Sequence, residues 1–318
     1  MTNWPREEGA GRCLIFNPTY LFASHDDDFS MSRVSKSFLS YAYLWPALAV
    51  LIALTIFPTI YTIYLSLSEY KSYVLTHQFV GAKNYIDLMN QANFYNSLHV
   101  SALYVLLTVA VSIFFGFVLA LALNQNLRAT SIFRAIVILP FTIAPIITGF
   151  TWRYLFDSNQ GLVGAFILPL LGLNFGSILG NPTNAFVGIV FADVWSKTPL
   201  MFLIILGGLQ GISPTLYKAA KIDGASVISS FMHITLPLMK RALIIAVILK
   251  VIDSVNSFDQ VYVMTRGGPG NATQVLAIEG YLIAFSNYNI GMAAALGVVM
   301  IVISVISISI LIRYYNKT

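Results

Sequence analysis

The sequence predicts an all-α integral membrane protein with six transmembrane helices and both termini in the cytoplasm. The composition is the first reason, because hydrophobic residues make up 57% of the chain and charged residues only 10%, with a mean hydropathy of +0.77. Soluble domains carry about 25% charged residues. The second reason is that six apolar runs each provide the roughly 20 residues that a bilayer-spanning helix needs. The third is an uneven distribution of Lys and Arg between alternate loops.

The six apolar runs define the predicted spans and make the lipid bilayer a partner of the chain. They are Tyr41–Ser66, Leu98–Leu123, Ile132–Phe156, Asn184–Gly208, Arg241–Met264 and Ile290–Ile312. Pro140 and Pro145 interrupt the third span, and Pro199 interrupts the fourth. Prolines are tolerated in membrane helices where neighbouring groups satisfy the freed backbone carbonyls. We therefore keep all six runs as spans.

The loop charges give the orientation. With the N-terminus inside, the cytoplasmic segments hold twelve Lys and Arg residues, whereas the external loops hold only Lys71, Lys83 and Arg266. Cytoplasmic loops of membrane proteins carry an excess of positive charge. The distribution therefore predicts cytoplasmic termini and, for a bacterial or archaeal chain, a location in the cytoplasmic (inner) membrane.

The first residues differ from the rest of the chain. Residues 1–39 include three consecutive aspartates and no complete apolar run, so they are predicted to form a mobile cytoplasmic tail. Met31 begins a short basic lead into the first span, which makes it an alternative start of translation. The first span is too long for the apolar core of a cleavable signal peptide. Residues 40–318 are predicted to form the six-helix membrane domain.

Several functional classes are disfavoured by the residues that the chain lacks. Its net charge of +5 is spread over loops rather than gathered on one face, which argues against nucleic acid as a partner. Cys13 is the only cysteine, and the four histidines show no metal-ligand spacing, so no metal site is predicted. A phosphate-binding GxxxxGK[ST] loop is also missing, so any ATP that drives this chain must be bound by another one.

The loop between the fourth and fifth spans, residues 211–237, has the pattern of a compact helical element. Ser213 suits a helix N-cap and Pro214 the first helical position. A short helix is predicted over Leu216–Asp223, and Gly224 suits the left-handed conformation that ends a helix. From these residues alone, an ordinary connecting loop and a docking element for another protein both remain open.

This loop resembles the cytoplasmic signature of ABC importer permeases, EAAxxDGAxxxxxFxxIxLP. The matching residues are Ala219, Ala220, Asp223, Gly224, Ala225, Phe231, Ile234, Leu236 and Pro237. Lys218 departs from the pattern because the family has Glu there. The resemblance implies that the loop is a coupling helix, with Ala219–Ala225 in a groove of an ATPase subunit. The charge reversal at Lys218 implies a changed contact at that point.

Other segments resemble the carbohydrate-uptake, maltose-type branch of the same family. They are Phe79–Tyr85, Ser257–Thr265 with Gly267–Pro269, and Gly291–Ala295. The resemblance implies a type I importer permease that works by alternating access and does no covalent chemistry itself. It also implies four kinds of partner: a second homologous permease, two ATPase subunits that bind ATP and Mg²⁺, and an extracellular or periplasmic solute-binding protein. This chain itself is expected to bind no cofactor.

Polar residues in the fifth span suggest a substrate path. On a continuous helix most of them would share one face, and sugars need hydrogen-bonding groups of this kind. The candidate path residues are Lys250, Asp253, Asn256, Ser257 and Gln260, with Trp195 of the fourth span as a stacking platform. The alternative is that Lys250 and Asp253 pair and only hold helices together. Asp193 and Lys197, which are four residues apart, are predicted to pair locally.

Other functions stay open at this stage. The same architecture could carry a polyamine or a phosphorylated polyol, and a phosphate would favour Lys250 as its cation. An ion-coupled secondary transporter would need no ATPase, but the loop signature and the lack of a visible repeat disfavour it. An intramembrane enzyme would need a nucleophile–base pair or a metal cluster at depth, and the sequence offers neither.

Overall fold

The structure is a computed structural model that describes residues 44–71, 78–125, 130–172 and 176–316. The predicted tail, residues 1–39, and the alternative start at Met31 lie outside the described residues. The chain divides into two units, residues 1–59 and 60–318. The described part is mostly helical, with one short antiparallel pair of strands.

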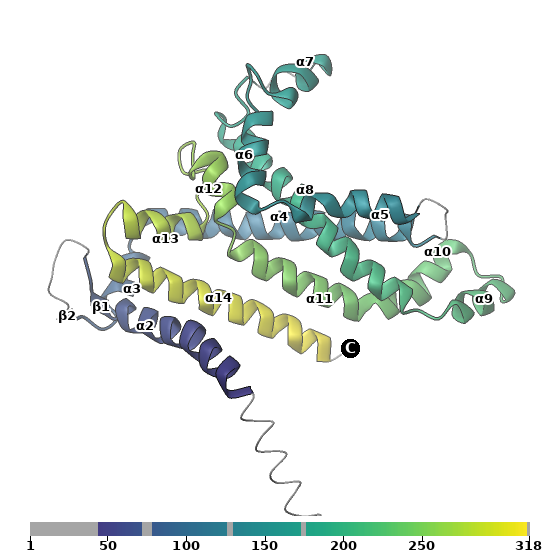
Figure 1. Ribbon diagram of the computed structural model, residues 1–318, viewed down its shortest axis with the longest axis horizontal. Helices are drawn as coiled ribbons and strands as arrows, with labels where there is room; N and C mark the ends of the chain where they lie inside the picture. The colour runs from purple at the N-terminus through teal and green to yellow at the C-terminus, as the bar shows by residue number, and fades with distance from the viewer. Residues whose placement is uncertain (1–43, 72–77, 126–129, 173–175, 317–318) are drawn as a thin grey trace, which may run out of the picture. The chain divides into compact units, whose positions relative to one another are not determined.

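The elements follow in chain order (Figure 1). The π-helical turn η1 (Ile52–Ile56) continues into α2 (Phe57–Ser66), which crosses the boundary between the two units. The strands β1 (Ser68–Glu69) and β2 (Gln78–Phe79) come next. The helices after them are α3 (Lys83–Met89), α4 (Ala92–Leu123), α5 (Thr130–Ile138), η2 (Leu139–Thr142), α6 (Pro145–Leu155), η3 (Leu162–Ile167), α7 (Leu168–Leu170), α8 (Pro182–Gln210), α9 (Pro214–Ile222), α10 (Val227–Ser230), η4 (Phe231–Thr235), α11 (Leu236–Val255), α12 (Asp259–Thr265), α13 (Leu276–Phe285) and α14 (Ile290–Asn316).

Four of the predicted spans are long apolar helices in the described part of the chain. They are Leu44–Ser66, Ala92–Leu123, Pro182–Gln210 and Ile290–Arg313, which match the first, second, fourth and sixth predictions. The second begins at Ala92 rather than at the predicted Leu98. Pro199 lies inside α8 without ending it.

The third predicted span, Ile132–Phe156, is wrong as a single helix. Thr130–Thr142 and Pro145–Leu155 meet at an angle of 94°. Pro145 disfavours helical geometry at the residue before it, and Ala144 accordingly has extended backbone angles. The bent pair counts either as one broken span or as a re-entrant loop.

The fifth predicted span, Arg241–Met264, is also wrong as a continuous helix. The helix α11 ends at Val255, and α12 begins only at Asp259. The Asn256 side chain donates a hydrogen bond to the Ile252 carbonyl at 2.8 Å. Short polar side chains compete with the backbone in this way and favour helix ends. The sequence predicted that the polar residues between 250 and 260 share one helix face. This holds only for the residues up to Val255, where the helix ends.

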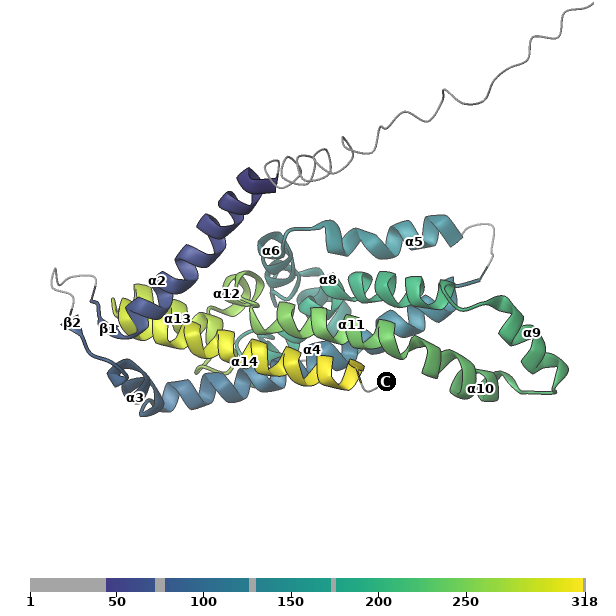
Figure 2. The ribbon, with the colours of Figure 1, turned by 90° about the horizontal axis from the view of Figure 1, so that it is seen from below.

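The core of the second unit lies where α4, α8 and α11 pack side by side, with α14 against α11 (Figures 1 and 2). Met201, Phe202 and Met239 are fully or almost fully buried there. Gly116 lets α4 approach α8 closely, because a Cβ at this position would lie 2.9 Å from the Met201 Cβ. These contacts bring the polar residues of α8 and α11 face to face.

The loop that holds β1, β2 and α3 is fixed by one buried side chain. The Asn84 Nδ2 donates to the carbonyls of Ser66 and Ser68, at 2.8 and 2.9 Å. The Tyr85 hydroxyl also makes a hydrogen bond to Ser66 Oγ. The segment Phe79–Tyr85, singled out in the sequence, thus packs back onto the end of α2.

Replacing Asn84 with alanine should destabilise the chain by about 2 kcal/mol, because two buried carbonyls lose their donor. Thermal unfolding of the detergent-solubilised protein measures this. Asn90→Ala is the matched control, since that side chain is exposed at the end of the same helix. Equal stability of the two variants would contradict the prediction.

Candidate functional site

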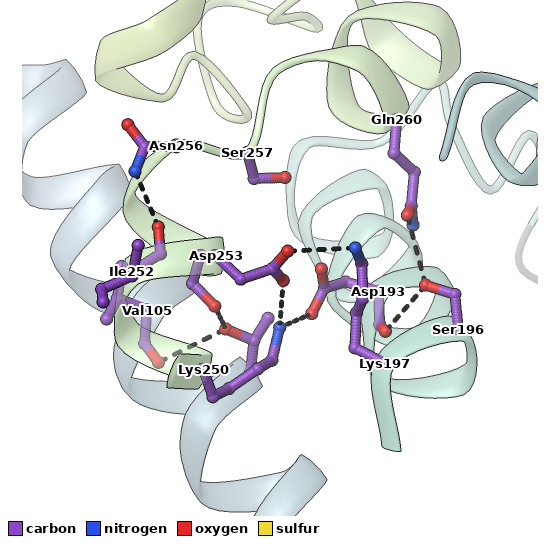
Figure 3. Close-up of polar contacts among 12 residues, drawn as sticks. Val105, Asp193, Ser196, Lys197, Lys250, Ile252, Asp253, Asn256, Ser257 and Gln260 are labelled. Carbon is purple, nitrogen blue, oxygen red and sulfur yellow. Dashed lines mark hydrogen bonds and ion pairs between the residues drawn. The ribbon is translucent and has the colours of Figure 1, made fainter. Parts of the chain in front are cut away.

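Four charged side chains form one continuous ion-pair network between α8 and α11, which we call the charged quartet. Lys250 Nζ lies 2.6 Å from Asp193 Oδ2 and 3.2 Å from Asp253 Oδ2. Lys197 Nζ lies 3.0 Å from Asp253 Oδ1. Figure 3 shows Lys250 between the two carboxylates, with Lys197 on the other side of Asp253. The positive and negative charges therefore alternate along the quartet and balance.

Burial differs along the quartet. The side chain of Lys250 is 0% exposed and that of Asp193 2%, whereas Lys197 is 18% and Asp253 36% exposed. A buried charge is tolerated only with a counter-charge and hydrogen bonds. The inner pair, Lys250 and Asp193, therefore meets that requirement within the chain, while the outer pair, Lys197 and Asp253, is partly exposed.

The predicted local pair of Asp193 and Lys197 is wrong, because each of them pairs with a residue of α11 instead. Residues four apart on α8 share a face, and this face packs against α11, where opposite charges are closer. The pairing of Lys250 with Asp253, which the sequence left open, does occur.

A cavity of about 250 Å³ opens beside the quartet. Four of the six predicted path residues line it, namely Asp253, Asn256, Ser257 and Gln260. Pro145, Asp193, Lys197, Ile252, Phe258 and Asp259 complete the wall. Because α11 and α12 are separate helices, the turn between them places these polar groups around one space. A path role for these residues stays a prediction.

The other two predicted path residues lie elsewhere. Lys250 is enclosed between the helices, behind the cavity wall. Trp195 makes an edge-on contact with Trp152, with ring centroids 5.4 Å apart and an interplanar angle of 79°. The sequence could not distinguish a ring that lines a cavity from one that packs against another ring.

The cavity wall carries uncharged hydrogen-bonding groups as well. Ser257 Oγ is 3.1 Å from the Tyr104 hydroxyl, and Gln260 Oε1 accepts from Ser196 Oγ at 3.5 Å. Gln260 Nε2 is buried and has no hydrogen-bond partner among the described residues. Tyr104 and Ser196 were missed in the sequence because neither belongs to the fifth span. Donors and acceptors of this kind suit a hydroxyl-rich solute.

The loop between α8 and α11 has the predicted caps. Ser213 caps α9 through the Thr215 N–H, Pro214 is the first residue of the helix, and Gly224 has a φ of +77°. The helix covers Pro214–Ile222, two residues earlier at its start than predicted. A hydrogen bond of 2.9 Å between the Tyr217 hydroxyl and Thr235 Oγ1 closes the loop.

The surface of this loop is open. Of the nine residues that match the family signature, five are exposed and four are half-buried. The exposed ones are Ala219, Asp223, Gly224, Leu236 and Pro237, and Lys218, which departs from the signature, is exposed as well. Sequence reasoning missed a second feature, which we call the apolar tip. It consists of Ile222, Val227 and Ile228, which are 87%, 87% and 76% exposed. Large exposed apolar side chains gathered next to polar ones are typical of protein–protein contacts.

Comparison with known proteins places these features in a family. Residues 78–317 match the model of the binding-protein-dependent transport system inner membrane component family. The trehalose/maltose transport system permease protein MalF of Thermococcus litoralis is 38% identical over 262 residues, or 82% of this chain and 87% of that protein. The sn-glycerol-3-phosphate transport system permease protein UgpA of Agrobacterium fabrum is 28% identical, over 88% of this chain and 95% of that one.

A solved structure shares the fold. A chain of a bacterial ABC transporter for import of the acidic polysaccharide alginate superimposes with a TM-score of 0.78, covering 90% of this chain and 98% of that chain. The sequence identity is 17%, so the likeness concerns the fold alone. The chain, with its helix breaks after Thr142 and after Val255, therefore shares its overall fold with that solved chain.

Proposed function

The chain belongs to the family of inner-membrane components of binding-protein-dependent transport systems, and from that premise we propose that it is the permease subunit of an ATP-driven sugar importer. The observation that carries the proposal is the capped, exposed loop between α8 and α11, which bears the family signature. The family match favours this function over an ion-coupled secondary transporter.

A neutral sugar is the solute that the cavity supports best. The relative with 38% identity is named for trehalose and maltose. A phosphorylated polyol would favour a free cation at depth, but Lys250 is enclosed between two carboxylates and Lys197 pairs with Asp253. Besides its charged groups, the cavity wall carries the hydroxyl of Ser257 and the amides of Asn256 and Gln260, which suit sugar hydroxyls.

The proposed assembly contains more than this chain. Six spans with both termini inside would place the loop 211–237 in the cytoplasm, where two ATPase subunits would bind ATP and Mg²⁺. A second homologous permease would complete the path. One solved alginate importer is described in complex with an alginate pentasaccharide-bound periplasmic protein, which supports a solute-binding protein as the external partner here.

The proposed mechanism is alternating access. Closure of the ATPase subunits on ATP would push on the loop, and the loop continues directly into α8 on one side and, through η4, into α11 on the other. These two helices carry the cavity wall at Asp253 and Lys197. The path would then open to the opposite side of the membrane. The chain does no covalent chemistry in this scheme.

Purification of the tagged chain from native membranes tests the proposal. We expect an ATPase and a second permease to co-purify, and the reconstituted complex to take up a neutral disaccharide when ATP is inside and the binding protein outside. A chain that purifies alone under gentle solubilisation, or uptake that needs an ion gradient and no ATP, would overturn it.

Replacing Gly224 with valine should lower ATP-driven uptake several-fold without preventing membrane insertion. A β-branched residue at a φ of +77° strains the turn by about 1–3 kcal/mol. No atom lies within 4 Å of the added Cβ, so the strain stays in the loop. Gly207→Ala is the control, because its Cβ also meets open space but the helix accepts alanine. Equal uptake by both variants would count against a coupling role of the turn.

A further inference from the structure

We propose that the charged quartet is a positioning device, which fixes α8 against α11 so that both helices and the loop between them move as one body during transport. The proposal rests on the permease function proposed above and assigns part of its mechanism to Asp193, Lys197, Lys250 and Asp253. None of these residues needs to touch the solute for this role.

Stability alone does not account for the quartet. Moving charges out of water costs several kcal/mol per ion, and well-packed apolar residues of similar volume often hold helices together as well or better. Charged groups at one level of two largely apolar helices therefore suggest a role in fixing how the two helices pack against each other. Buried polar contacts of this kind are best known for fixing the register of packed helices.

The geometry specifies a single register. Asp193 and Lys197 are one helical turn apart on α8, as are Lys250 and Asp253 on α11, and all three ion pairs are within 3.2 Å. Two of the pairs, Asp193–Lys250 and Lys197–Asp253, join the helices, so a slide of one turn, about 5.4 Å, would displace the partners of both, whereas Lys250–Asp253 lies within α11 and would persist. It would also separate Asp193, whose side chain is 2% exposed, from its counter-charge Lys250. Shear between the two helices is therefore strongly opposed at this level.

The quartet lies at the same height above the loop on both helices. Lys197 is 13 residues before the end of α8 at Gln210, and Lys250 is 14 residues after the start of α11 at Leu236. Both separations correspond to about 20 Å along a helix. The helices α8 and α11 with the loop between them form a helical hairpin, and the quartet joins its two arms far from that loop.

A second contact joins the arms close to the loop. Gly208 packs against α11, where a Cβ added to it would lie 2.6 Å from the Ala242 Cβ. The hairpin is therefore held at two levels. Because Asp253 and Lys197 also line the cavity, displacement of the loop would carry the cavity wall with it.

A reversible cross-link tests whether α8 and α11 move together. Cysteines replace Gly208 and Ala242 in a Cys13→Ser background, and a shift of about 1 Å brings the two Cβ atoms to the ~3.8 Å of a disulfide. We expect the oxidised complex to keep at least half of the ATP-driven uptake of its reduced form. Loss of uptake on oxidation, with recovery on reduction, would overturn the proposal. The two single-cysteine variants are the controls.

Removal of the buried pair tests the quartet itself, whether or not the cysteine variant folds. In the variant Asp193→Asn with Lys250→Met, Asp253 and Lys197 still pair. We expect ATP hydrolysis to persist while the solute transported per ATP falls about fivefold or more. The exchanged variant, in which all four charges are reversed (Asp193→Lys, Lys197→Asp, Lys250→Asp and Asp253→Lys), keeps the alternation of charge and should restore at least half of the ratio. A purely structural role would change the yield of complex and not this ratio.

An unchanged ratio in the pair-removed variant would overturn the proposal, and so would a low ratio that the exchanged variant does not raise. The wild-type complex separates this failure from that of the proposed function. If wild-type protein shows no ATP-dependent uptake, the permease assignment fails; if it transports and the variants transport equally well, only the positioning role fails.

Discussion

Replacing Lys250 alone with methionine should abolish the assembled complex or leave only traces of it. The substitution removes the counter-charge of Asp193, whose side chain is 2% exposed between two helices. Breaking a buried pair by deleting one partner costs about 3–5 kcal/mol, because the remaining charge is left uncompensated. The measurement is the yield of monodisperse complex from solubilised membranes, followed by ATP-driven uptake of the fraction that assembles.

Lys197→Met is the matched control for this prediction. Lys197 is half-buried at the cavity, and its partner Asp253 keeps its contact with Lys250. The remaining carboxylate is 36% exposed, so water can solvate part of its charge. We expect a clearly smaller loss of complex than for Lys250→Met. Losses of the same size would show that the burial of the inner pair does not matter.

The sequence predicted the long helices well, and the reason is physical. A bilayer requires about 20 apolar residues in one run. The helix α4 and residues 290–312 of α14 contain no Asp, Glu, Lys or Arg, and α8 contains only Asp193 and Lys197. The caps of α9 were also predictable, because Ser213, Pro214 and Gly224 act within one turn of the backbone. Local rules suffice where a feature depends only on neighbouring residues.

The helix breaks were harder to predict. Pro140 and Pro145 marked the third span, but proline in membrane helices can give a mild kink or a sharp bend, and only the surroundings decide between them. No proline or glycine near Asn256 indicates in the sequence that the helix breaks there. It depends on a side-chain bond to the Ile252 carbonyl, which competes with continuation of the helix.

The ion pairs of the site depend on contacts between two helices, and a single sequence does not show which helices pack together. Asp193 and Lys197 satisfy the spacing of a local pair, and no property of α8 alone shows that α11 brings two opposite charges closer. The cavity poses the same problem. Its wall joins the end of α11, the start of α12, part of α8 and Pro145, segments far apart in the sequence.

Introducing a charge into the apolar tip should separate the chain from the proposed ATPase subunits. Ile222 and Val227 are each 87% exposed, so an aspartate at either position disturbs little inside the chain. In a docked complex the same carboxylate would be buried against the partner without a counter-charge. Central apolar anchors of an interface are worth about 2 kcal/mol or more each, which corresponds to about a 30-fold weaker association.

Co-purification of the ATPase with Ile222→Asp, with Val227→Asp and with the double variant measures this effect. We expect each single change to remove most of the ATPase and the double change to remove all of it, while thermal stability of the isolated chain stays the same. Ile222→Val is the control, because it keeps an apolar side chain of nearly the same size. ATPase recovery at the wild-type level from the double variant would mean that the tip lies outside the docked surface. In that case the signature residues Ala219–Ala225 would have to form the contact with the ATPase without the apolar tip. The exposure of the three large apolar side chains of the tip would then need another explanation, such as burial against the membrane surface.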